Sequence, residues 1–239
     1  MSAWLHRHAT AQQKWKIIRR AVAGFSWVPF VDMLAVSGSM ALYNTKPSSD
    51  FDMLVVARAR RIWTVRLLLL FMAQVVGRRR KHWDQAAPDK FCFNHYVTTA
   101  SLTIAPEIRN EYTAVIYAHL VPLWGKEVFE EFMAANASWL KRFGMYRDPI
   151  NGQTLHTKTG GKVTAMIKRQ LELLLLEPLG DSLEFMAERI QRRIIARHAT
   201  AALGGRIMVS NQELAFHPHS RVPGILGQFA QDTGQKQLL

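Results

Sequence analysis

Two acidic residues, Asp50 and Asp52, stand one residue apart, about ten positions after a Gly38-Ser39 pair. Two carboxylates on one side of a strand repel each other, so this spacing favours a site where a cation neutralises them. Hard oxygen ligands of this kind suit Mg²⁺ or Mn²⁺. A divalent ion bound to both carboxylates and to nucleotide phosphates would stabilise the charge that develops during in-line attack on the α-phosphorus.

Two strands are needed to position these residues. The apolar run over residues 31–36 predicts a buried strand that ends in a tight turn at Gly38. Glycine lets the backbone approach a ligand closely, and Ser39 can cap a following helix and offer its hydroxyl and backbone N–H to a phosphate. Residues 50–56 predict the second strand. Because side chains alternate along a strand, we expect its two carboxylates on one face and its apolar residues in the core.

The Gly38-Ser39 turn followed by Asp50-Phe51-Asp52 resembles the signature of the DNA polymerase β-type nucleotidyltransferase superfamily, over residues 25–105. The resemblance implies an α/β (α+β) fold with a small mixed sheet flanked by helices. It also implies Mg²⁺-dependent transfer of a nucleoside monophosphate from a nucleoside triphosphate to a hydroxyl acceptor. In that interpretation Gly38 and Ser39 bind the phosphates, while Asp50 and Asp52 bind the metal and are catalytic.

The superfamily carries a third carboxylate on the next strand, expected here over residues 90–97. The best polar candidate at that position is Asn94, which is a weaker ligand for Mg²⁺ and a poor general base. The resemblance therefore predicts a metal site made by Asp50, Asp52 and Asn94. It leaves no evident residue to deprotonate the acceptor hydroxyl.

Other polar residues near this strand have simpler interpretations. His95 is a lone histidine on a strand, which favours a structural role. Asp84 and Asp89 lie in the preceding loop and could reach inward, Asp89 being the better substitute for the third acid, although solvated loop carboxylates are the default. Cys92 is the single cysteine of the chain, which excludes an intramolecular disulfide and a thiolate metal cluster.

The chain is strongly basic, because 31 Lys and Arg against 18 Asp and Glu give a formal net charge of +13. Such a field attracts polyanions, so nucleic acid or another polyanionic acceptor is a candidate partner beside the nucleoside triphosphate. Arg58 and Arg66 follow the second strand and are the candidates for contact with triphosphate oxygens. The basic run at residues 78–81 is interpreted as the last turn of a helix over residues 59–81, where cations complement the helix dipole.

Two domains are expected. Residues 1–105 would form the nucleotidyltransferase-like domain, with an N-terminal amphipathic helix over residues 11–25. Residues 106–239 would form an all-helical C-terminal portion, with a break or mobile loop near residues 144–161. Its helices are expected over residues 106–123, 127–143, 162–176 and 182–203. Residues 207–219 are not helical in pattern.

Composition sets the outer limits on the class of protein. With 49% hydrophobic and 21% charged residues, the chain is typical of a soluble globular protein. The longest apolar run, over residues 67–76, is about half the ~20 residues needed to cross a bilayer, so no transmembrane segment is expected. The absence of a secretory pattern makes the cytoplasm the simplest compartment. The oligomeric state stays open.

Two further classes of function also stay open. A protein of the same fold that has lost its chemistry could bind nucleotide or nucleic acid without turnover, which the missing third acid and the positive charge both fit. An interaction subunit could instead use its helical C-terminal part to hold a partner. RNA ends, proteins and small hydroxylated molecules all serve as acceptors in so broad a superfamily, and the fold does not choose among them.

Overall fold

A computed structural model describes residues 3–80, 87–146, 161–198 and 206–217 of the protein. These residues fold around a six-stranded sheet with the strand order β4-β1-β2-β3-β6-β5. Neighbouring strands are antiparallel, except that β2 and β3 are parallel. The elements, in chain order, are α1 (Ala3–Phe25), β1 (Val31–Val36), α2 (Gly38–Ala41), β2 (Phe51–Ala57), α3 (Ile62–Val75), β3 (Phe91–Thr98), the 3₁₀ turn η1 (Pro106–Ile108), α4 (Glu111–Ala118), β4 (Val121–Trp124), α5 (Lys126–Arg142), α6 (Lys162–Leu174), α7 (Leu179–His198), β5 (Arg206–Val209) and β6 (Glu213–His217).

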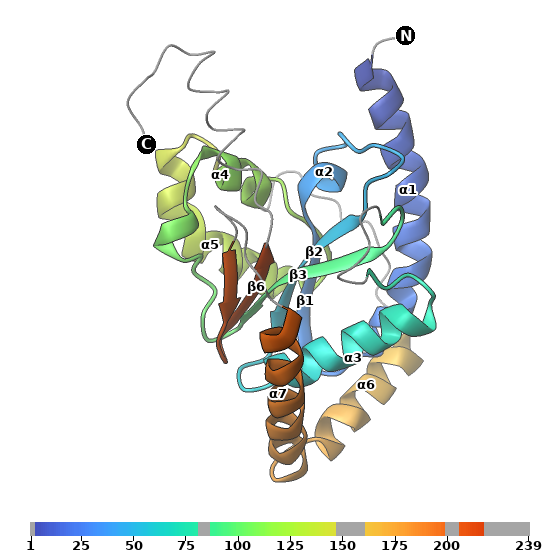
Figure 1. Ribbon diagram of the computed structural model, residues 1–239, viewed down its shortest axis with the longest axis vertical. Coiled ribbons are helices and arrows are strands. Elements are labelled where there is room, and N and C mark those ends of the chain that lie inside the picture. The colour runs from blue at the N-terminus through green and yellow to red at the C-terminus, as the bar shows by residue number, and fades with distance from the viewer. Residues whose placement is uncertain (1–2, 81–86, 147–160, 199–205, 218–239) are drawn as a thin grey trace.

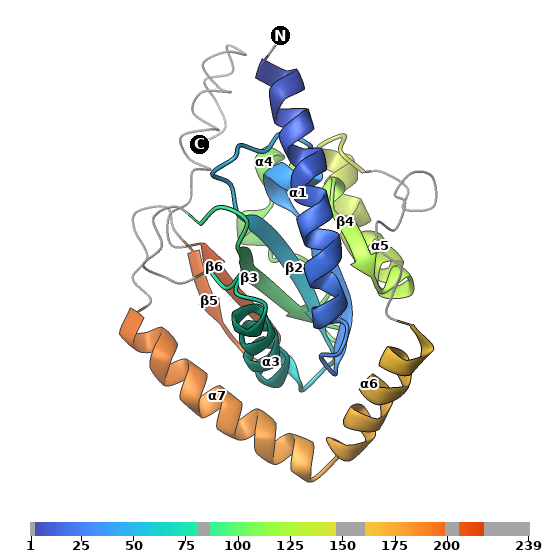
Figure 2. The same cartoon turned by 90° about the vertical axis from the view of Figure 1, so that its right-hand side faces the viewer.

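Helices cover both faces of the sheet, as Figures 1 and 2 show. One hydrophobic core lies between the sheet and α1 and α3, and the other lies between the sheet and α4 and α5. Alternation divides β1 between them, since Leu34 and Val36 enter the first core and Met33 and Ala35 enter the second. Because both faces are covered, β1 and β2 are nearly continuous apolar runs.

The mixed α/β class is confirmed, but the expectation of an all-helical portion after residue 105 is not. The expected helix over residues 106–123 divides into η1, α4 and the strand β4. Pro122 lies in β4, and it is tolerated because β4 is the edge strand and pairs with β1 alone. A short strand with a proline resembles a helix end in the sequence, and its pairing with β1 decides its conformation.

A second correction concerns the end of the chain. β5 and β6 form an antiparallel hairpin, and β6 extends the sheet by pairing with β3. Strands β4, β5 and β6 thus all come from beyond residue 105, while the domain boundary itself stays a prediction. Most of the predicted break near residues 144–161 lies outside the described residues, which resume at residue 161.

No helix in the described part of the chain combines the length and the apolar character that a membrane span requires. The helix α1 is amphipathic as expected, and its Trp15, Ile18, Val22 and Phe25 are all buried against the sheet. Its span is longer than predicted, since it begins at Ala3.

Candidate functional site

The turn after β1 lies directly against Asp52. The backbone N–H of Ser37 donates to the carbonyl oxygen of Asp52 at 2.9 Å. Gly38 has a φ of +63°, and a Cβ at this position would lie 2.8 Å from Oδ2 of Asp52. Glycine is therefore required both by the left-handed backbone and by the nearby carboxylate. Ser39 follows in the single turn of α2, with its hydroxyl 3.4 Å from that of Thr45.

The two carboxylates lie where β2 begins. Asp50 immediately precedes the strand, Asp52 is its second residue, and Phe51 and Met53 are buried in the core, as the alternation predicted. Oxygen atoms of both aspartates and Sγ of Cys92 all lie within 4.8 Å of one another. The structure therefore brings two carboxylates and a thiol together beside the Gly38 turn.

Cys92 and Asn94 reach this cluster from β3, the parallel neighbour of β2. Cys92 pairs in register with Asp52. The next residues of β2 pair with Phe93 and His95, so Asn94 has no partner on β2 and forms a bulge. The amide Nδ2 of Asn94 donates to Oδ1 of Asp52 at 2.8 Å. In this arrangement the amide N–H of Asn94 orients the carboxylate of Asp52. A role of Asn94 as a metal ligand stays a prediction.

Arg80 is a charged neighbour of this cluster that sequence reasoning missed. Its Nη1 forms a short ion pair with Oδ2 of Asp50 and lies 3.5 Å from Sγ of Cys92. The interpretation of residues 78–81 as the last helical turn is wrong, because α3 ends at Val75 and Gly77 turns the chain with a φ of +67°. The glycine before the arginines was the available signal, since a left-handed glycine often follows a helix end.

Among the residues that the structure describes, the positive charge near the two carboxylates does not offset their burial. Burial, with repulsion from Asp50 as the second cause, raises the pKa of Asp52 from 3.8 to about 7, although Arg80 and the hydrogen bond from Asn94 act in the opposite direction. Burial also raises the pKa of the Cys92 thiol, and the two carboxylates add to that effect. A divalent cation would reverse both effects, because it favours the ionised forms. The donor set therefore fits a metal ion.

A buried lysine fixes the loops on both sides of the carboxylates. Lys14 of α1 is 4% exposed. Its ammonium group donates to the carbonyl oxygens of Pro47 and Ser49, at 2.9 and 2.8 Å, and to Oδ1 of Asp89 at 2.7 Å. All three donors of the lysine are satisfied. Asp89 is thus engaged by Lys14 and does not substitute for a third acid, and Asp84 lies outside the described residues.

The structure does not bring the two candidate arginines to the carboxylates. Arg58 follows β2 at its far end, where it forms ion pairs with Asp32 at 2.8 Å and with Glu172 at 3.0 Å. Arg66 lies within α3, where it donates to Gln191 and lies 4.8 Å from the ring of Phe216. Both side chains hold helices to the rest of the fold, and neither supports a role in phosphate binding at Asp50 and Asp52.

His95 is buried on the side of the sheet that faces α4. Its Nδ1 lies 2.7 Å from the hydroxyl of Tyr117, and its Nε2 lies 3.2 Å from Oε1 of Glu213. The imidazole thus connects α4 and β6 to β3, which agrees with the structural role expected for it.

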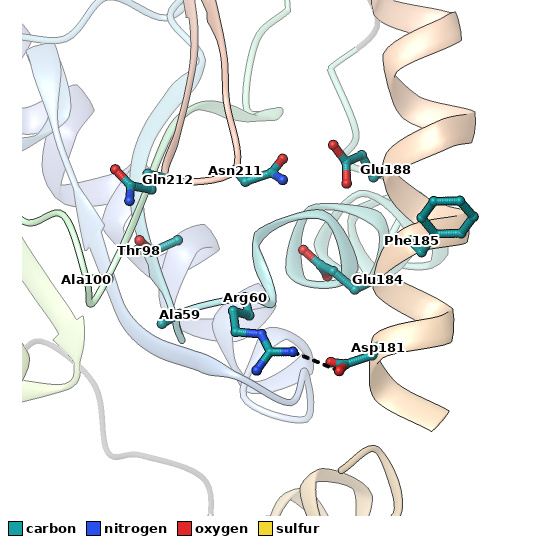
Figure 3. Close-up of a pocket in the computed structure, with 10 residues that line it drawn as sticks. All are labelled: Ala59, Arg60, Thr98, Ala100, Asp181, Glu184, Phe185, Glu188, Asn211 and Gln212. Carbon is teal, nitrogen blue, oxygen red and sulfur yellow. Dashed lines mark hydrogen bonds and ion pairs between the residues drawn. The ribbon is translucent and has the colours of Figure 1, made fainter. Parts of the chain in front are cut away.

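A cavity of about 390 Å³ opens beyond the far end of β2. Figure 3 shows side chains of α7 on one side of it, the Asn211–Gln212 turn on another, and Arg60 reaching towards Asp181. Its charged groups are already paired, since Arg60 contacts Asp181 at 2.9 Å and Glu188 contacts Arg192 at 2.7 Å. The cavity does not coincide with the carboxylate cluster. Its lining consists of Ala59, Arg60, Thr98, Ala100, Asp181, Glu184, Phe185, Glu188, Asn211 and Gln212.

Glu184 in this cavity holds α7 against the start of α3. Its carboxylate accepts hydrogen bonds from the backbone N–H groups of Trp63 and Thr64, at 2.9 and 2.8 Å. These N–H groups have no acceptor within α3, so a carboxylate there caps the helix. Glu184 therefore has a structural role.

The site thus offers two carboxylates and a thiol near the starts of the parallel strands β2 and β3, with the Gly38 turn and Arg80 beside them. Comparison of the chain with protein-family models, with curated proteins and with solved structures gave no match.

Proposed function

We propose that Asp50 and Asp52 bind a divalent metal ion together with a nucleoside triphosphate, and that the protein is a nucleotidyltransferase. The observation that carries this proposal is the cluster of both carboxylates and the Cys92 thiol within 4.8 Å, beside a glycine turn that would clash with Asp52 if it bore a side chain. A glycine at that place lets the carboxylate of Asp52 lie close to the backbone of the turn.

The residues present have distinct roles in this proposal. Asp50 and Asp52 supply the hard oxygen ligands that suit Mg²⁺ or Mn²⁺, and Gly38 and Ser39 lie beside the phosphates. Asn94 fixes the orientation of Asp52 through its hydrogen bond. The thiol of Cys92 is a softer ligand, and it favours Mn²⁺ over Mg²⁺. When bound, the metal would supply positive charge to the triphosphate and to the transition state.

The proposed reaction conserves atoms and charge. The acceptor hydroxyl oxygen forms a bond to the α-phosphorus, the bond from that phosphorus to the bridging oxygen of the β-phosphate breaks, and pyrophosphate leaves. The proton of the hydroxyl passes to water. The net charge of +13 favours a polyanionic acceptor such as nucleic acid.

A specific observation favours a second candidate, a protein that binds the nucleotide without turnover. Asn94 stands where a third carboxylate is expected, and Asp89 is held by Lys14. Within the described residues, this leaves the cluster without a further carboxylate to act as general base. Metal-dependent binding would persist in such a protein, while transfer would be absent.

One pair of measurements separates these candidates. The protein is incubated with nucleoside triphosphates labelled at the α-phosphorus, Mn²⁺ or Mg²⁺, and RNA, protein or small hydroxylated acceptors, and calorimetry measures nucleotide binding with and without metal. The Asp50→Asn/Asp52→Asn variant should lose both activities if the protein is an enzyme. The matched control is Glu177→Gln, which removes one carboxylate from an exposed ion pair with Arg60.

The outcomes differ for each candidate. Transfer by the wild type but not by the double variant supports the enzyme. Metal-dependent binding without transfer, lost in the double variant, supports the binding protein. If the wild type neither binds nor transfers nucleotide, or if the double variant behaves like the wild type, both candidates are wrong and an interaction subunit becomes the better hypothesis.

A further inference from the structure

Exposed apolar side chains are concentrated on α3, α6 and α7. Of the fifteen large apolar side chains exposed in the described ranges, thirteen lie on these helices or on the turn that joins α6 to α7. Figures 1 and 2 show that the three helices gather towards the same end of the molecule. A surface helix normally turns its apolar side chains to the core, so exposed rows of this kind mark an interaction surface.

On α7 the apolar row is distinct from the face that packs on α3. Gln191 belongs to the packed face, since its amide donates to the carbonyl oxygen of Trp63 at 2.8 Å. Met186, Ile190 and Ile194 each precede a buried residue of that face, and they are 58%, 49% and 51% exposed. Their spacing of four residues places them in a single row along the helix.

Comparable rows run along the other two helices. Leu67, Phe71 and Val75 repeat every four residues on the outer side of α3. Within α6 no residue is fully buried, and its Val163 and Met166 are both more than half exposed. The apolar surface is defined here as these rows on α3, α6 and α7.

The charge around the apolar surface is positive. The carboxylates of α6 and α7 are each bound by an arginine or by backbone N–H groups. They belong to Glu172, Asp181, Glu184 and Glu188. Five exposed basic side chains of the same helices form no ion pair with any residue that the structure describes, namely Lys162, Arg169, Arg189, Arg193 and Arg197. A partner for this surface must therefore be both apolar and anionic.

We propose that the apolar surface docks the protein on an anionic lipid bilayer. Apolar rows bordered by arginine and lysine are the combination by which helices bind the headgroup region of anionic membranes. A second copy is disfavoured, because a self-complementary interface would bring the unpaired cations of both copies together. The three helices that carry the rows run in different directions (Figure 2), which a fluid bilayer accommodates better than one linear peptide does. This inference does not depend on nucleotide binding.

Vesicle flotation tests the proposal with the full chain. Vesicles of phosphatidylcholine alone are compared with vesicles that also contain phosphatidylglycerol, at low and high salt. The wild type should bind the anionic vesicles about tenfold or more tightly than the neutral ones, and this preference should fall with salt. The variant Met186→Asn/Ile190→Asn/Ile194→Asn should lose binding. Phe185→Asn is the control, because Phe185 is 57% exposed but lines the cavity on another side of α7.

A second variant keeps the test decisive if the triple variant misfolds, as circular dichroism would reveal. Arg193→Gln/Arg197→Gln changes only exposed side chains and should weaken binding to anionic vesicles about tenfold or more. The proposal is overturned if the wild type does not bind anionic vesicles, or if the folded variants bind as it does. Light scattering that shows a dimer lost in the triple variant, without vesicle binding, would instead assign the surface to a second copy.

Discussion

Neutralising Asp52 should stabilise the metal-free protein at neutral and alkaline pH. Burial raises the pKa of Asp52 from 3.8 to about 7. A carboxyl group whose pKa rises on folding contributes stability that is fully present below its unfolded pKa, and this contribution is lost as the pH rises through its folded pKa. The wild type should therefore lose stability between about pH 4 and pH 7. The variant Asp52→Asn carries no group that titrates there and should escape this loss.

The size of the effect follows from the pKa shift. A rise of about three pKa units corresponds to about 4 kcal/mol in the free energy of unfolding. Asp52 is only partly buried by exposed area, and solvent screens its interaction with Asp50, so about 1–3 kcal/mol should be realised. The hydrogen bond from Asn94 can persist, because an asparagine at residue 52 retains a carbonyl oxygen as acceptor.

Urea denaturation of both proteins at pH 4.5, 6 and 8, with a chelator present, measures this difference directly. Asp52→Asn should be more stable than the wild type at pH 8, and the two should converge towards pH 4.5. Adding Mn²⁺ at pH 8 should stabilise the wild type and leave Asp52→Asn unchanged, because a ligand stabilises only the state that binds it. Glu177→Gln, at an exposed ion pair, should differ from the wild type by less than about 1 kcal/mol at every pH.

The reasoning is refuted if Asp52→Asn is no more stable than the wild type at pH 8 in the presence of chelator. It is also refuted if the difference between the two proteins does not shrink on acidification. Equal responses of both proteins to Mn²⁺ would leave the electrostatic argument intact and would contradict the metal site.

Three further substitutions test how the site is built. Gly38→Ala and Gly77→Ala should each cost about 1–2 kcal/mol of stability, because both glycines have a left-handed backbone that alanine disfavours. Only Gly38→Ala should weaken Mn²⁺ binding in calorimetry, because its methyl group would meet Asp52. Lys14→Met should cost about 1–3 kcal/mol in chemical denaturation, because it removes the ammonium group that binds the half-buried carboxylate of Asp89 and the carbonyl groups of Pro47 and Ser49. Cys92→Ser should shift the preference of the site from Mn²⁺ towards Mg²⁺ in competitive titration.

Each of these has a contradicting result. Equal metal affinity in the two alanine variants would show that the turn does not border the metal. A loss below about 1 kcal/mol for Lys14→Met would mean that water replaces the lysine. An unchanged metal preference in Cys92→Ser would exclude the thiol from the ligand set.

The sequence was sufficient for those elements whose periodicity is strong. The strand over residues 31–36, the strand that carries Asp52, and α5 were all predicted within one or two residues. The strands β4, β5 and β6 were missed because each is four or five residues long and is stabilised by its partner in the sheet. Such short runs carry too few repeats to distinguish a strand from a helix end or a loop.

For the site, strand alternation predicted that Asp50 and Asp52 lie on one side of the strand, because alternation is a local property. Their position beside Gly38 depends on the pairing of β1 with β2, and it was expected from the resemblance of the motif. The prediction for Arg58 was wrong because Arg58 follows the end of β2, whereas Asp50 and Asp52 lie at its start. Closeness in sequence does not bring the two ends of a strand together. Arg80 was missed because its contact with Asp50 spans thirty residues and depends on where α3 stops. Contacts of this kind are fixed by the tertiary fold.

The charge balance around Asp50 and Asp52 does not fit a simple structural ion pair at the start of a strand. Arg80 supplies one positive charge and pairs with Asp50, so one carboxylate would suffice for a structural ion pair. Asp52 is then a second, insufficiently compensated acid, and its raised pKa predicts that it destabilises the folded chain at neutral pH. An asparagine there would keep the hydrogen bond and remove that cost. A residue that lowers stability in this way is expected where function requires the charge, and a divalent cation is the partner that two adjacent carboxylates fit best.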